Sequence, residues 1–174
     1  MEKRFIMTAF GKDRPGVVED VSRLLFEHGC NLEDSSMTRL ADEFAVILLF
    51  TNRKAGVEQG LERECRRLER ERGISAYFRE AQKEAPEPER RRNLTTIRVE
   101  GVDHTGIVFN VSRFLSANGI NIENLSSEVV HSPESGTARY RMEIQVEFPR
   151  GASADTLRNG LDRLGDELNV DITF

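Results

Sequence analysis

The spacing of apolar residues in the first half of the chain predicts a series of strands and helices. Residues 5–10 favour a strand, and residues 30–40 and 44–50 favour a hairpin that turns at 41–43. A helix is expected to begin at Pro15 and end at Gly29, with an apolar face made by Val17, Val18, Val21, Leu24 and Leu25. The apolar face of a second helix is formed by Val57, Leu61, Cys65 and Leu68, and residues 74–80 follow as a strand. The predicted order is βαββαβ.

The second half of the chain repeats this order. Strands are predicted over residues 95–101, 120–131, 138–148 and 169–174. The first helix of this half has an apolar face formed by Ile107, Val108, Val111, Phe114 and Leu115. The closing helix has the most regular spacing, with Ala154, Leu157, Leu161, Leu164 and Leu168.

An internal repeat supports this division. Shifted by ninety positions, residues 11–36 and 101–126 share 12 identities without a gap. Residues 82–93 (QKEAPEPERRRN) contain two prolines, seven charges and no apolar residue larger than alanine, as is typical of a linker. We therefore expect two domains, 1–81 and 94–174, each an α+β ferredoxin-like fold in which four antiparallel strands are backed by two helices.

The two halves differ in the sheet face that the helices leave uncovered. Residues 139–148 alternate polar and apolar side chains, which is typical of a sheet with one solvated face. Residues 44–50 (FAVILLF) are apolar on both faces. We expect a partner domain, another subunit or a loop to cover the second face of this strand, which favours a homodimer.

Composition and charge exclude several functions. Residues 1–81 carry 14 bases and 15 acids, and residues 94–174 carry 7 bases and 12 acids, so neither half is suited to a polyanion. Basic residues in 61–72 alternate with acids, which predicts a solvated helix face rather than direct nucleic-acid binding. No signal peptide or apolar membrane span is found, and Cys30 and Cys65 predict neither a disulfide framework nor a metal site. We expect a cytoplasmic protein without membrane contact.

No catalytic constellation stands out in the sequence. It contains no nucleophile beside a base, no paired acids, no P-loop and no dinucleotide motif. His28 and His131 have no acidic or nucleophilic partner nearby in the sequence and are expected to be structural or incidental. The prediction is a protein that is not an enzyme and has neither cofactor nor metal.

The candidate site is a glycine-containing loop that occurs once in each half. The segments GKDRPG and GVDHTG each lead into a helix, whose first N–H groups and positive dipole end favour an anion such as a carboxylate. Gly16 and Gly106 permit close approach, and Asp13 and Asp103 can accept a hydrogen bond from an ammonium group. These features suit a free amino acid. Alternatively, the two aspartates only cap their helices.

Three further positions near these loops leave alternatives open. Asn31 and Asn121, each two residues after a glycine, can present an amide to the ligand or can form the turn into the next strand. His104 stands where Arg14 stands in the first half. It can contact a ligand and titrate near neutral pH, or it can be an exposed histidine without a role.

The repeated βαββαβ order, the GxDxxG loops and the GxN turns (GCN and GIN) resemble the ACT domain, a small regulatory module that binds amino acids. The resemblance implies that such domains pair side by side and bind a small amino acid, glycine or serine-like, at the interface near the first loop. The implied ligand-binding residues are Asp13, Arg14, Pro15, Gly16, Val17, Asn31, Asp103, His104, Thr105, Gly106, Ile107 and Asn121.

The resemblance also implies that the protein signals to a partner regulator or enzyme rather than touching DNA. Two alternatives stay open. One is a protein-interaction module that has lost its ligand, and the other is a detached regulatory subunit of an enzyme of amino-acid or one-carbon metabolism.

Overall fold

The computed structural model describes residues 2–82, 94–131, 136–148 and 154–174, with side chains of the last segment from residue 157 onward. Contacts divide the chain into two compact units, Met1–Glu87 and Pro88–Phe174, and each is described by itself. Nearly all of the predicted linker, 82–93, lies outside the described residues, so the domain limits 1–81 and 94–174 stay a prediction.

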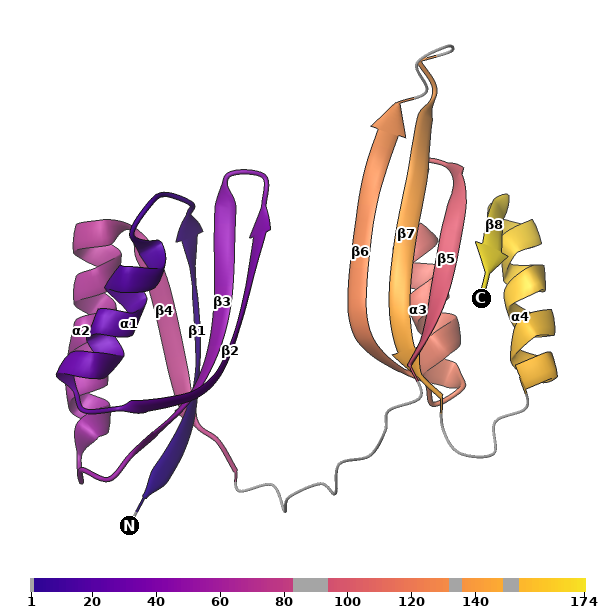
Figure 1. The fold of residues 1–174 in the computed structure, drawn as a ribbon. Helices are drawn as coiled ribbons and strands as arrows, with labels where there is room; N and C mark the ends of the chain where they lie inside the picture. The colour runs from indigo at the N-terminus through magenta and orange to yellow at the C-terminus, as the bar shows by residue number, and fades with distance from the viewer. Residues whose placement is uncertain (1, 83–93, 132–135, 149–153) are drawn as a thin grey trace. The chain divides into compact units, whose positions relative to one another are not determined.

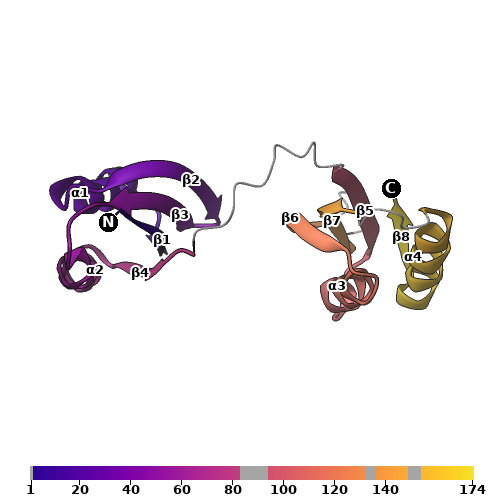
Figure 2. The ribbon, with the colours of Figure 1, turned by 90° about the horizontal axis from the view of Figure 1, so that it is seen from below.

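The first unit follows the predicted order (Figure 1). Its elements are β1 (Lys3–Lys12), α1 (Val17–Glu27), β2 (Asn31–Leu40), β3 (Glu43–Asn52), α2 (Val57–Arg72) and β4 (Ile74–Glu80). The strands form one antiparallel sheet in the order β2-β3-β1-β4. The two helices cover one face of this sheet, as the view along the strands shows (Figure 2).

The second unit has the same architecture. Its elements are β5 (Leu94–Val102), α3 (Ile107–Ala117), β6 (Asn121–His131), β7 (Ala138–Glu147), α4 (Ala154–Leu168) and β8 (Val170–Thr173). The sheet order is β6-β7-β5-β8, again antiparallel. The predicted fold, two ferredoxin-like domains, is confirmed.

The numbers of equivalent residues in the two units differ by a constant offset on each side of one insertion. Gly11 is equivalent to Gly101, an offset of 90, and both pair with the last strand of their sheet, opposite Ile74 and Val170. From β3 onward the offset is 96, because more residues separate β6 from β7 than separate β2 from β3. Helix α4 and strand β8 are therefore compared with α2 and β4 at an offset of 96.

The core of each unit lies between the helices and one sheet face. The predicted apolar stripes are buried, except that Phe114 and Leu168 are only partly buried, and there are two errors: Val18 is 56% exposed and Val108 is 40% exposed. Each lies about 100° round the helix from its buried predecessor, at the margin of the stripe. Ala154 belongs to a predicted stripe, but its side chain lies outside the described residues.

The uncovered sheet faces differ as the sequence predicts. In the second unit the face carries charged side chains joined in ion pairs: Arg98 with Glu143 at 2.8 Å, and Arg141 with Glu100 at 3.2 Å. In the first unit the face carries Phe10, Ile47 and Tyr77, which are 46%, 49% and 65% exposed, and the rings of Phe10 and Tyr77 stack. The expectation that another surface covers this face stays a prediction.

Among the helices that the structure describes, none has the length and apolar character needed to span a membrane.

Candidate functional site

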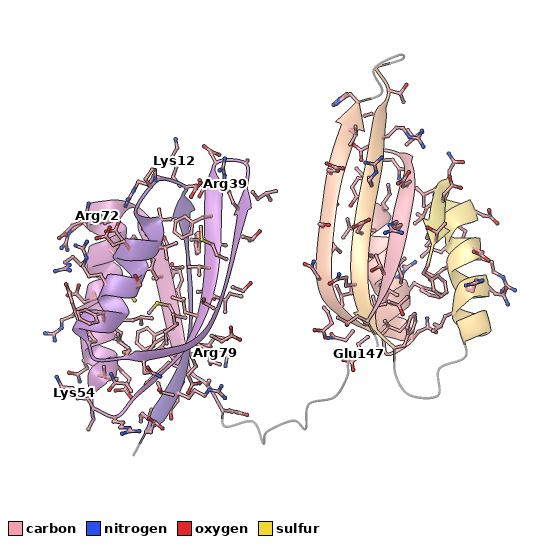
Figure 3. The ribbon with its side chains drawn as sticks, in the orientation of Figure 1. Lys12, Arg39, Lys54, Arg72, Arg79 and Glu147 are labelled. Atoms are coloured by element: carbon pink, nitrogen blue, oxygen red, sulfur yellow. The ribbon has the colours of Figure 1, made fainter. Side chains whose placement is uncertain are left out.

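The candidate loop of the first unit joins the end of β1 to the start of α1. Lys12, the last residue of β1, pairs with Glu43 at the start of β3, so the loop lies at the β2–β3 turn end of the sheet. Figure 3 places Lys12 and Arg39 together at this end and Lys54 at the other. The loop is therefore bordered by the β2–β3 turn on one side and the start of α1 on the other.

Helix α1 begins at Val17, two residues after the predicted start at Pro15. The residue before it, Gly16, has φ 94°, a left-handed conformation that glycine adopts without strain. Gly106 precedes α3 in the same way, with φ 99°. Because proline favours the first helical position, the sequence analysis placed the start of the helix at Pro15. In the structure Pro15 and Gly16 form a turn, and the helix begins after it.

No side chain of the described residues caps either helix. The alternative in which Asp13 and Asp103 serve as caps is therefore wrong. The N–H of Val17 makes only a long contact of 3.4 Å with the oxygen of Arg14, and the first bond within the helix comes from Asp20 N–H to Gly16 O. N–H groups of the first turn thus point out of the helix end without a side-chain acceptor.

The first glycine of each motif serves packing. A Cβ on Gly11 would lie 2.7 Å from the oxygen of Gly73, and a Cβ on Gly101 would lie 2.6 Å from Val170 Cγ1. Both glycines let the end of the first strand approach the start of the last strand. At these positions the absence of a side chain thus permits close packing of the two strands.

Asp13 is anchored through both its main chain and its side chain. Its N–H donates to Asp42 O at 2.7 Å, and its carboxylate lies 3.3 Å from Arg39 Nε. In the second unit Asp103 N–H likewise donates to Ala138 O. The residue equivalent to Arg39 there is Val129, so this arginine partner is missing from the second loop.

Arg14 folds back over its own helix. Its Nη2 donates to Asp20 Oδ2 at 2.7 Å, and Arg72 Nε lies 3.8 Å from Asp20 Oδ1. The hydrogen bond from Arg14, with the nearby charge of Arg72, holds the pKa of Asp20 below its usual value. Sequence reasoning missed Asp20 and Arg72, because neither belongs to a motif and Arg72 lies on a different helix.

His104 is held by main-chain oxygens instead. Its Nε2 lies 2.7 Å from Leu168 O, at the end of α4, and its Nδ1 lies 3.1 Å from Thr105 O. Since both acceptors are carbonyl oxygens, the protonated ring satisfies both, which raises the pKa of His104. Asn110, the equivalent of Asp20, donates to Gly106 O at 2.9 Å. The two loops therefore share a backbone but are held by different side chains.

The remaining predicted residues fall into three groups. Val17 and Ile107 are buried in the cores, so only their main chain can face a ligand. Pro15 and Thr105 are exposed in the loops. Asn31 and Asn121 start β2 and β6, at the opposite ends of their sheets from the loops.

The separation of the asparagines from the loops is large. Because β2 has 10 residues, Asn31 lies roughly 30 Å from the Asp13 loop. Asn121 donates its side-chain N–H to Glu123 Oε1. Within one unit the structure brings together the loop residues but not the asparagines.

A cavity of the second unit lies beside the second loop without including its central residues. It has a volume of about 540 Å³ and is lined by Gly101 and Val102 together with Arg139 and Asp171, among others, but by none of residues 103–107. No group of three His, Cys, Asp or Glu in the described part of the chain is placed to hold a metal ion.

Comparison with known proteins identifies the family. The profile of the ACT domain matches residues 3–79, and a second ACT domain profile matches residues 95–159. The chain belongs to the ACT domain family. It is a tandem pair, and we call the two units ACT domain 1 and ACT domain 2.

One relative that aligns over nearly the whole chain is named as a transcriptional repressor. The glycine cleavage system transcriptional repressor of Escherichia coli is 26% identical over 168 residues, which cover 95% of this chain and 85% of the repressor. The chain is thus an ACT-domain protein homologous to that repressor. A UPF0237 protein of Methanopyrus kandleri is 44% identical over 61 residues, covering 35% of this chain and 68% of that protein.

Solved structures share the fold. An unknown protein from Galdieria sulphuraria has a TM-score of 0.78 at 29% identity, covering 99% of this chain and 97% of that one. A putative glycine cleavage system transcriptional repressor has a TM-score of 0.70 at 22% identity, covering 99% and 96%.

Proposed function

We propose that this protein is a non-catalytic regulator that binds a small amino acid, glycine or serine-like, at the β1–α1 and β5–α3 loops. It passes the signal to a partner regulator or enzyme in the cytoplasm, without touching DNA itself. The homology to a glycine cleavage system repressor supports the regulatory role and the choice of ligand class.

The observation that carries the proposal is the start of α1 and α3. Each helix is preceded by a glycine with positive φ and has no side-chain cap among the described residues. Exposed N–H groups at the positive end of a helix dipole attract a carboxylate. In this proposal the carboxylate of Asp13, which lies 3.3 Å from Arg39 Nε, accepts a bond from the ligand's ammonium group.

Asn31 takes part only under one geometric condition. It lies at the far end of its own sheet from the Asp13 loop. An asparagine at this position can therefore contact a ligand at the loop only if it belongs to another ACT domain placed along the sheet edge. Strand β2 is an edge strand and all its residues are exposed, which leaves its outer backbone groups open to such pairing.

An amino acid that binds one arrangement of paired domains more tightly than another shifts the population toward that arrangement. The shift is limited by the difference between the two affinities. This linkage gives a protein without catalytic residues a means of signalling to its partner. We propose domain limits of 1–81 and 94–174, with 82–93 as the linker.

The test is a thermal-shift screen of the full chain against the twenty amino acids, with Asp13→Ala and Asp103→Ala variants. A ligand at one hundred times its Kd stabilises the native state by about 2.7 kcal/mol, so a bound amino acid raises the melting temperature by several degrees. Asp42→Ala is the matched control, because its exposed carboxylate lies at the same end of the sheet but outside the loop.

We expect one or two amino acids to stabilise the wild type and the Asp42 variant, with the shift reduced in the loop variants. If no amino acid stabilises the wild type at several millimolar, the proposal fails and the ligand-free interaction module is favoured. If Asp42→Ala reduces the shift as much as Asp13→Ala, the loop is not the site.

A further inference from the structure

ACT domain 1 has a groove between α2 and the edge strand β4, away from the loop. Its volume is about 370 Å³. The apolar part is formed by Phe5, Cys65, Ala76 and Phe78, and the acidic part by Glu58, Glu62, Glu69 and Glu80. Tyr77 and Arg66 complete the lining. The groove thus combines an aromatic floor with a mainly acidic rim.

The equivalent surface of ACT domain 2, between α4 and β8, holds an arginine side chain against a phenylalanine ring. Phe174 is equivalent to Phe78 and Arg158 to Glu62, both at the offset of 96 that relates the helices and strands. The guanidinium carbon of Arg158 lies 5.1 Å from the centroid of the Phe174 ring, within cation–π range. ACT domain 2 therefore covers its edge phenylalanine with its own arginine. ACT domain 1 has an acid at that position instead.

The rim glutamates differ in their pairing. Lys3 Nζ lies 2.7 Å from Glu58 and 3.2 Å from Glu80, so one lysine serves two acids. Glu69 accepts a hydrogen bond from Ser75 Oγ at 2.9 Å. For Glu62 the described residues provide no ion pair. With Arg66 and Lys3 counted, four acids face two bases, so the groove keeps a negative surplus.

We propose that this groove binds an arginine side chain carried by an extended segment of a partner protein. The guanidinium stacks on Phe78, as that of Arg158 does on Phe174, and donates two N–H bonds to the Glu62 carboxylate. Arginine fits better than lysine, because its planar, weakly hydrated guanidinium both stacks on a ring and binds a carboxylate in bidentate geometry.

The position of β4 favours a protein segment over a free small molecule. It is the last strand of the order β2-β3-β1-β4, so within the described residues no strand lies beside its outer backbone N–H and C=O groups. An extended segment can pair with this edge while one of its side chains enters the groove. The inference deepens the proposed function, on which it rests for the existence of a partner, but it does not depend on a ligand at the loops.

The test uses a ¹⁵N-labelled full chain and NMR titration with a blocked pentapeptide, with arginine at its centre between valine and threonine residues. We expect shifts of the amides of α2 and β4, with at least fivefold weaker binding when citrulline, which is isosteric but uncharged, replaces the arginine. Equal binding of the citrulline peptide overturns the proposal. If free L-arginine binds as tightly as the peptide, the proposal is also overturned, because the groove is then a small-molecule site.

Two variants on one helix give the matched control. Glu62→Arg should fill the groove as Arg158 does in ACT domain 2, and weaken peptide binding at least tenfold with an unchanged circular dichroism spectrum. Glu71→Arg makes the same charge change at an exposed position of α2 outside the groove, and should keep binding within about threefold. Wild-type binding by Glu62→Arg, or an equal loss in both variants, contradicts the proposal. The loop screen and this titration report on different regions, so either proposal can fail alone.

Discussion

Replacing Gly11 with alanine tests whether the first glycine of the loop motif serves packing. The added Cβ would lie 2.7 Å from the main-chain oxygen of Gly73 and 3.4 Å from Ile74 Cα. Main-chain atoms cannot rotate away, so β1 and the start of β4 must separate where Gly11 and Ile74 pair in the sheet. Such overpacking costs about 1–3 kcal/mol, and a weakened sheet hydrogen bond adds about 1 kcal/mol.

Alanine also restricts the unfolded chain, which offsets about 0.4–1 kcal/mol of this loss. We therefore expect Gly11→Ala to destabilise ACT domain 1 by about 1–3 kcal/mol. In ACT domain 2 the nearest atom to a Cβ on Gly101 is Val170 Cγ1, a side-chain atom at 2.6 Å, and the nearest main-chain oxygen is farther away than in ACT domain 1, at 3.1 Å. Because a valine rotation relieves part of the clash, Gly101→Ala should cost about half as much.

Hydrogen exchange of the full chain, followed by mass spectrometry, measures both effects, because the slowest amides report the free energy of opening each domain separately. Gly11→Ala should lower protection in the sheet of ACT domain 1 and leave ACT domain 2 unchanged. Wild-type protection in Gly11→Ala, or a larger loss in Gly101→Ala, would refute the packing argument.

Three further predictions concern titratable groups. The pKa of His104 is raised above 6.5, so its contribution to stability is complete below pH 6.5 and is lost as the pH rises through the folded-state pKa. His104→Gln should therefore lower the melting temperature at pH 5.5 but hardly at pH 9. The pKa of Asp20 is lowered, so Asp20→Asn should cost about 1–2 kcal/mol in urea unfolding at pH 7, and the difference should vanish as the pH falls through that lowered pKa. Burial raises the pKa of Cys65 to about 11, so iodoacetamide at pH 8 should label it far more slowly in the native than in the unfolded chain, as measured by mass spectrometry.

The fold was predictable because its signals are local. The stripe Val57, Leu61, Cys65 and Leu68 is buried as expected, since helical spacing alone decides which side chains face the sheet. The errors lie at element ends. Val18 has the right residue type but stands at the margin of its stripe, and Pro15 precedes α1 because Gly16 adopts a positive φ that the sequence permits but does not require.

The site was predictable only in its backbone. The motif marks the loop, but the contacts that hold it join residues far apart in the chain: Asp13 with Arg39, and His104 with Leu168. Such pairs leave no periodic trace, and the partner of His104 is a main-chain oxygen, for which the residue type carries no information. Asp20 was missed as the partner of Arg14 for a different reason: it is only six residues away but belongs to no motif.

The two loops differ in a way that bears on how they respond to solution conditions. Their backbones nearly coincide in conformation, with φ of 94° at Gly16 and 99° at Gly106, so each offers the same helix start to a carboxylate. The hydrogen bond from Arg14 holds the pKa of Asp20 below its usual value, so this ion pair does not change across the physiological pH range. Hydrogen bonds to the carbonyl oxygens of Thr105 and Leu168 raise the pKa of His104, and the ring loses one of these two bonds when it loses its proton. Any difference between the loops in ligand affinity should therefore change with pH, and the change should arise in ACT domain 2.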